Sequence, residues 1–120
     1  FYPGTGDASE TGVGNIVNVP LSAGSGTRAF REAYDNIILP ALEAFRPELL
    51  IISAGFDAHE RDPLANLNLT GADYDWITRK LMAIADQYAR GRVVSALEGG
   101  YDLEGLADGV NAHVKALLRT

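Results

Sequence analysis

Two short apolar runs predict the centre of the fold. Leu49 to Ala54 and Val93 to Leu97 are almost continuously apolar and rich in branched residues, the pattern of parallel strands buried on both faces. The segment between them predicts a helix that starts at Thr70, where Asp73 completes a capping box, and stops at Gly91. Its apolar stripe consists of Tyr74, Ile77, Leu81, Ile84, Ala85 and Tyr88. Strand, helix and strand at this spacing predict a parallel crossover and an α/β fold.

Two more amphipathic segments flank this unit. Apolar residues at helical spacing between Phe30 and Phe45 predict a helix with Thr27 as its N-cap. Pro40 lies inside it and should remove one backbone hydrogen bond, so we expect a kink or two pieces. The last helix should run from about Leu103 to Leu118.

The N-terminal part has a different pattern. Phe1 to Asn15 is rich in glycine and other turn-forming residues, which predicts a structured loop rather than a helix or a strand. Ile16 to Pro20 is β-branched and closed by a proline, which predicts a short strand. We find no internal repeat or linker, so we expect one folding unit.

Composition narrows the function classes. The 120 residues include 16 acidic and 10 basic ones, giving a net charge of −6 and no basic tract for nucleic acid or an anionic membrane. The absence of cysteine excludes disulfides and thiolate metal sites, so any metal must be held by His, Asp or Glu. No apolar segment approaches the ~20 residues that span a bilayer, and we take the cytoplasm as the default compartment. Because the chain opens on Phe1 inside a loop-like stretch, we expect a fragment of a longer protein.

Polar residues follow both predicted strands. Asp57 comes soon after the first strand and Tyr101 soon after the second, so both should emerge at the carboxyl edge of one sheet, where ligands bind in such folds. Gly55, Gly99 and Gly100 would let the backbone turn sharply or approach a ligand there. A carboxylate and a phenol suit a metal ligand or base paired with an oxyanion donor. The pattern equally allows Asp57 to stabilise a turn and Tyr101 to pack against the last helix.

Three further residues invite chemistry but have simpler interpretations. His59 lies two residues from Asp57, which suggests a joint metal site, yet we favour an exposed or turn-stabilising histidine. Asp62 precedes Pro63 and is most simply a turn initiator. His113 falls near the end of the last helix, where a cation suits the helix dipole, and we assign it no chemistry.

Several stretches resemble, in their order and spacing, the C-terminal part of the zinc-dependent histone deacetylase superfamily, which also contains acetylpolyamine amidohydrolases and acetoin-utilisation proteins. They are Phe1-Tyr2-Pro3-Gly4-Thr5-Gly6, Asn18-Val19-Pro20-Leu21, Ser53-Ala54-Gly55-Phe56-Asp57-Ala58-His59 with Asp62-Pro63-Leu64, and Leu97-Glu98-Gly99-Gly100-Tyr101. The resemblance implies a three-layer α/β fold, arginase/deacetylase-like, of which residues 1–120 would be the C-terminal portion of a single catalytic domain.

The resemblance also implies roles for individual residues. Asp57 is similar to an aspartate zinc ligand, and Tyr101 to the tyrosine that polarises the amide carbonyl and stabilises the tetrahedral intermediate. Tyr2 would line the narrow tunnel that holds the acyl-lysine or acyl-amine chain, and Gly99 and Gly100 would shape the pocket floor. The implied reaction removes an acetyl or other acyl group from a lysine or polyamine nitrogen. Tyrosine at position 101, where some branches carry histidine, favours deacetylase activity.

The sequence departs from the family pattern in one large respect. The other zinc ligands and the paired general-base histidines of the family lie upstream of the matched region, and this chain has no equivalent. Because a catalytic zinc normally takes three protein ligands, we expect the parent enzyme to be active and this chain alone to be inactive. We also expect exposed apolar faces to make the chain self-associate or exchange elements with a neighbour. The alternative is a binding or assembly module that keeps the fold without catalysis.

Overall fold

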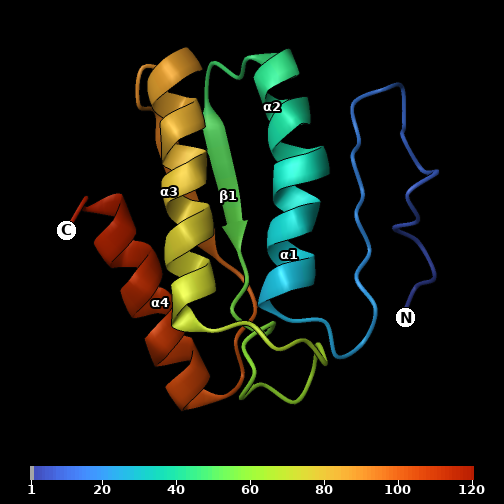
Figure 1. The fold of residues 1–120 in the computed structure, drawn as a ribbon, viewed down its shortest axis with the longest axis vertical. Helices are drawn as coiled ribbons and strands as arrows, with labels where there is room; N and C mark the ends of the chain where they lie inside the picture. The colour runs from blue at the N-terminus through green and yellow to red at the C-terminus, as the bar shows by residue number, and fades with distance from the viewer. Residues whose placement is uncertain (1) are drawn as a thin grey trace.

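The computed structural model describes residues 2–120, so Phe1, the first residue of the predicted loop, lies outside the described residues. The elements are, in order, α1 (Thr27–Ala33), the π-helical segment η1 (Tyr34–Ile38), α2 (Leu39–Phe45), β1 (Leu50–Ala54), α3 (Gly71–Tyr88), β2 (Val93–Leu97) and α4 (Leu103–Leu117). Figure 1 shows α3 between α4 and β1. No helix among residues 2–120 is both long and apolar enough to cross a bilayer.

The two strands pair in parallel through α3, which confirms the predicted crossover. Leu50 pairs with Val93 and Ala54 with Leu97. Beyond the last pair, the backbone N–H of Glu98 donates to the carbonyl of Ala54 at 2.9 Å. The segments that follow β1 and β2 therefore stay in register as they leave the sheet at its carboxyl edge.

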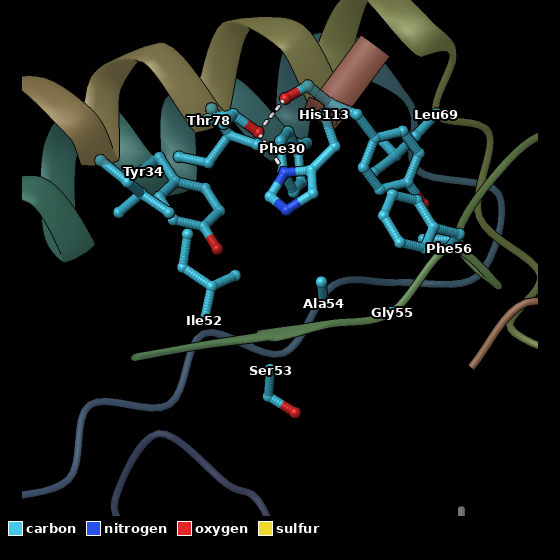
Figure 2. Close-up of a pocket in the computed structure, with 14 residues that line it drawn as sticks. Phe30, Tyr34, Ile52, Ser53, Ala54, Gly55, Phe56, Leu69, Thr78 and His113 are labelled. Carbon is cyan, nitrogen blue, oxygen red and sulfur yellow. Dashed lines mark hydrogen bonds between the residues drawn. The ribbon is translucent and has the colours of Figure 1, made fainter. Parts of the chain in front are cut away.

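One face of the sheet packs against helices. Ile52 and Ala54 of β1 point toward the helices, whereas Ser53 points to the other side (Figure 2). Two clusters form the core on the helical side. Their buried members are Ala54, Phe56, Leu69 and Tyr74 in one, and Leu50, Ala85 and Ala89 in the other.

The opposite face of the sheet is largely uncovered. Ile51 is 66% exposed and its cross-strand partner Val94 is 53% exposed. The predicted burial of both strand faces is therefore wrong for this chain, because the described helices pack on one side only. The expected self-association stays a prediction, and these side chains are the apolar surface that motivates it.

The helix predicted between Thr27 and Phe45 forms, but its details differ. The N-cap is Gly26, and Thr27 is the first helical residue, with its hydroxyl donating to Asp73 at 2.7 Å. The α-helix forms in two pieces, as Pro40 predicts, but the chain stays helical between them, because a π-helical turn precedes the proline and the N–H of Leu39 bonds to the carbonyl of Tyr34. The wider turn lets the chain pass the proline, which lacks an N–H to donate.

The predicted strand at Ile16 to Pro20 is wrong, since these residues have no regular structure. A strand needs a partner for its backbone groups, and no described strand pairs here. Instead, the Asn18 side chain donates to the carbonyls of Asp7 and Glu10. The segment before it forms the predicted loop of turns.

The ends of α3 and α4 follow the sequence signals. Thr70 and Asp73 form the predicted capping box at the start of α3. Gly91 ends it with a φ of +73°, and its N–H reaches back to the carbonyl of Ala85, as helix stops with glycine do. Asp102 caps α4 by accepting the N–H of Gly105 at 2.8 Å.

Candidate functional site

The loops after β1 and β2 lie side by side at the carboxyl edge of the sheet. The N–H of Phe56 donates to the carbonyl of Gly99 at 2.8 Å, which holds the two loops together. Asp57 and Tyr101 consequently line one open depression of about 480 Å³, together with Leu64 and Ala65. The predicted meeting of a carboxylate and a phenol at this edge is confirmed.

The Asp57 carboxylate rests against a glycine. A Cβ placed on Gly99 would lie 2.9 Å from Cγ and Oδ1 of Asp57, closer than real Cβ atoms come. None of the hydrogen bonds formed by the described side chains uses the Asp57 carboxylate, and the residue is only partly buried. Asp57 thus lines the depression with a carboxylate that accepts no hydrogen bond from the described residues.

Tyr101 is held through its backbone. Its side chain is 60% exposed, whereas its N–H donates to Oδ2 of Asp62 at 2.7 Å and the N–H of Asp102 donates to the same oxygen at 3.1 Å. The other oxygen, Oδ1, accepts the N–H of Leu64 at 3.0 Å. Asp62 therefore ties the loop after β1 to the loop after β2.

These bonds keep the Asp62 carboxylate ionised. Desolvation alone would raise the pKa of Asp62, but the backbone N–H groups of Leu64, Tyr101 and Asp102 outweigh it, so the pKa lies below its ordinary value. Asp62 is 5% exposed. The sequence indicated only a turn-initiating role, which the bond to Leu64 fulfils, and gave no signal of the bond across 39 positions.

His59 is buried rather than exposed, with 2% of its surface accessible. Its Nδ1 accepts the N–H of Arg61 at 3.2 Å, so Nε2 carries the proton and donates to Asp108 at 2.8 Å. That hydrogen bond is the main cause that lowers the pKa of Asp108, against desolvation. The expected exposure of His59 is wrong and its turn-stabilising role is confirmed. Its position next to Asp57 in the sequence does not bring the two together as ligands.

His113 is also buried, at 7% exposure. The Thr78 hydroxyl donates to the carbonyl of Tyr74 at 2.6 Å, so it accepts from Nδ1–H of His113 at 2.7 Å. The Ser95 hydroxyl then donates to Nε2 at 2.8 Å. Burial lowers the pKa of His113, which makes the ring a neutral core group. The expected interaction of a histidine cation with the helix end is wrong. Figure 2 shows the ring beside Thr78, on the helical side of the sheet.

The remaining predicted site residues divide into two groups. Neither Gly99 nor Gly100 lines the depression; Gly99 lies against Asp57, whereas Gly100 has a φ of +143°, and a Cβ there would lie 2.7 Å from a methyl carbon of Leu106. Tyr2 is 95% exposed and is absent from the lining of the depression. Among the described residues, the structure therefore brings together Asp57, Tyr101 and Gly99 but does not bring Tyr2 to them.

The side chains at this edge can supply one ligand of a metal site. The free Asp57 carboxylate is a suitable zinc ligand, but residues 2–120 contain no group of three or more His, Cys, Asp or Glu side chains that could hold a metal. A catalytic zinc takes three protein ligands. The described residues thus fit one zinc ligand and leave the others to be supplied from elsewhere.

The comparison with known families identifies the class of protein to which this fold belongs. Residues 1–117 match the histone deacetylase domain, so the chain belongs to that family. The structure of the HDA15 HD domain superposes with a TM-score of 0.92 at 40% identity, over 99% of this chain and 34% of that one. The deacetylase Clr3 gives the same TM-score at 36% identity, over 99% of this chain and 20% of that one. The expected parallel α/β fold with flanking helices is confirmed.

Curated relatives come from several different organisms. Type-2 histone deacetylase 2 of Dictyostelium discoideum is 42% identical over 98% of this chain and 8% of its own length. Histone deacetylase 14, chloroplastic, of Arabidopsis thaliana is 43% identical over 98% of this chain and 29% of its own. A histone deacetylase-like amidohydrolase of Pseudomonas aeruginosa is 43% identical over 83% of this chain and 27% of its own. The chain thus spans less than a third of the length of each of these relatives.

Proposed function

We propose that this chain contributes half of the active site of a zinc-dependent amidohydrolase, which removes an acetyl or other acyl group from an acyl-lysine or acylpolyamine nitrogen. The observation that carries the proposal is the meeting of a free carboxylate, Asp57, and an exposed phenol, Tyr101, in one depression at the carboxyl edge of a parallel sheet. Membership of the histone deacetylase family supports the reaction type.

Each residue at the edge has a distinct task in this proposal. Tyr101 donates its hydroxyl proton in a hydrogen bond to the amide carbonyl oxygen as negative charge develops there. Asp57 would hold one coordination position of the zinc, whose chemistry there would be to activate a water molecule and polarise the carbonyl. Leu64 and Ala65 give the depression an apolar wall that suits the methylene chain of a lysine or polyamine.

Other residues take supporting roles. Gly99 and Gly100 allow the backbone behind Asp57 to lie close to the core and so form the floor of the pocket. Tyr2 would contribute to the wall of the substrate tunnel in the complete catalytic domain. Because the chain carries one of the three protein ligands that a catalytic zinc needs, residues 1–120 by themselves should release no acetate.

The decisive experiment is Tyr101→Phe in the full-length protein loaded with zinc. Loss of one oxyanion donor should lower kcat for acetate release from acetyl-lysine or acetylpolyamine substrates on the order of 10²–10³-fold, with unchanged zinc content. Tyr88→Phe is the matched control, because Tyr88 lies at the end of α3 and keeps the ring that Arg46 overlies. Unchanged acetate release by the Tyr101 variant would overturn the proposed role and favour a binding module.

A further inference from the structure

We propose that Asp62 is a positioning residue for the reaction: its carboxylate sets the place of Tyr101 relative to Asp57. The inference rests on the proposed function, because it gives Tyr101 a part in the chemistry. Asp62 itself does not line the depression that holds Asp57 and Tyr101, so it acts through Tyr101 and not on the substrate.

The geometry is that of a clamp between two loops. Asp62 belongs to the loop that follows β1 and Asp57, yet its Oδ2 accepts the N–H groups of Tyr101 and Asp102 in the loop that follows β2. Its Oδ1 simultaneously accepts the N–H of Leu64 in its own loop. Hydrogen bonds to a carboxylate are roughly twice as strong as those between neutral groups. One buried side chain thus fixes both loops with respect to each other.

Tyr101 has few other restraints. Its side chain is mostly exposed and takes part in none of the hydrogen bonds formed by the described side chains. Gly100 before it has a φ of +143°. Because glycine has no Cβ, this residue restricts the backbone less than any other would. Asp102 after it is the N-cap of α4. The N–H bonds to Asp62 therefore fix the main chain of Tyr101, from which the phenol projects, together with the start of α4.

The amide variant Asp62→Asn tests this clamp with almost no change of volume. An asparagine offers only one acceptor oxygen, whereas Asp62 uses two oxygens for three N–H groups. Whichever way the amide turns, its NH₂ faces either the N–H of Leu64 or those of Tyr101 and Asp102. Both arrangements weaken the link between the loops, while Asp102 still caps α4 through Gly105.

The kinetic test uses the zinc-loaded full-length protein and a double-mutant cycle. Asp62→Asn should lower kcat by about 10- to 100-fold, the cost of misplacing a reacting group by about 1 Å, with little change in KM or zinc content. In the Tyr101→Phe background the same substitution should have a much smaller effect, because no hydroxyl is left to misplace. Effects on kcat that simply multiply would overturn the inference. Full activity of Tyr101→Phe alone would instead overturn the proposed function.

Hydrogen exchange provides a second readout that does not depend on activity. Asp62→Asn should speed amide exchange at Tyr101 and Asp102 in the full-length protein. Asp73→Asn is the matched control, because Asp73 is a fully buried carboxylate that accepts the backbone N–H of Thr70 and has no bond to the Tyr101 loop. It should speed exchange at the start of α3 and leave kcat unchanged below the unfolding temperature.

Asp62→Ser is the second variant, in case the amide prevents folding. Its shorter side chain removes the clamp, and its hydroxyl proton can rotate away from the N–H groups, so it should show the same loss of kcat and the same faster exchange. Unchanged exchange at Tyr101 and Asp102 in the folded variant would overturn the inference whatever the kinetics show.

Discussion

The carboxyl edge of the sheet carries Asp57 and Tyr101, whereas the N-terminal segment of residues 2–18 carries Tyr2, which the resemblance alone assigns to the site. The two regions are held in opposite ways. At the edge, Asp62 bonds to residues 39 and 40 positions away, and Phe56 bonds to Gly99. In the segment, the hydrogen bonds among described residues stay within the segment. The one with the largest separation in sequence joins the Asn18 side chain to the carbonyl of Asp7, 11 positions away. Figure 1 shows this segment, in blue, on the outer side of α1 and α2.

The difference shows which part of the site this chain determines by itself. Long-range bonds and the parallel register bring Asp57 and Tyr101 together, so their relative position is a property of the fold described here. Tyr2 is 95% exposed, and none of the hydrogen bonds of its segment joins it to the sheet. Variants at the edge should therefore act on catalysis itself, and variants in the segment on the binding of the substrate chain.

The largest expected effect in this comparison belongs to Gly99→Ala. The new methyl group would lie 2.9 Å from Cγ of Asp57 and 3.1 Å from Oδ2, so the carboxylate must move. We expect a loss of kcat/KM on the order of 10²-fold, since small displacements of reacting groups are costly, together with a lower zinc content. Acetate release and metal analysis of the full-length variant measure both.

Gly14→Ala is the control for the segment. Gly14 has a φ of +87° and nothing within 4 Å of the added Cβ, so the substitution strains the backbone without a clash. It should destabilise the protein by about 1 kcal/mol and leave zinc content unchanged. Equal losses of activity in the two variants would contradict the contrast between edge and segment.

Tyr2→Ala should have a smaller and different effect. If Tyr2 forms part of the tunnel wall, its removal weakens the binding of the methylene chain and raises KM roughly tenfold, while kcat changes little. Steady-state kinetics with acetyl-lysine and with free acetamide separates the cases, because acetamide has no chain to bind. An equal loss of kcat/KM for both substrates would contradict the role of Tyr2 in the tunnel wall.

The outcome at individual residues shows what the sequence can and cannot predict. The capping box of Thr70 and Asp73 and the stop at Gly91 involve neighbours in the chain, so local pattern predicts them. Ile16 to Pro20 has the composition of a strand, but a strand also depends on a partner, which composition does not encode.

The candidate site shows the same distinction between features set by local sequence and features that depend on distant partners. Asp57 and Tyr101 could be placed at one edge because the connection between parallel strands fixes where their ends meet. Oδ2 of Asp62 accepts the N–H of Tyr101, 39 positions away in the sequence. His59 forms a hydrogen bond with Asp108, 49 positions away. Pairings of this kind depend on how α4 packs, and no local pattern in the sequence specifies them.

The smallest expected effect concerns His113, whose neutral ring joins α3, β2 and α4 behind the sheet. Burial lowers its folded-state pKa below the ordinary value of about 6.5. Above that pH the ring is neutral in both states and contributes no pH dependence. As the pH falls below it, the unfolded chain takes up the proton and the native state does not, so the free energy of unfolding decreases. His113→Gln should lower the stability at neutral pH but make it less dependent on pH between about 7 and 5, as thermal unfolding of the full-length protein would show. A slope identical to that of the parent would mean that the ring takes up its proton at the same pH in the native state and in the unfolded chain. It would contradict the assignment of Nε2 as an unprotonated acceptor of the Ser95 hydroxyl.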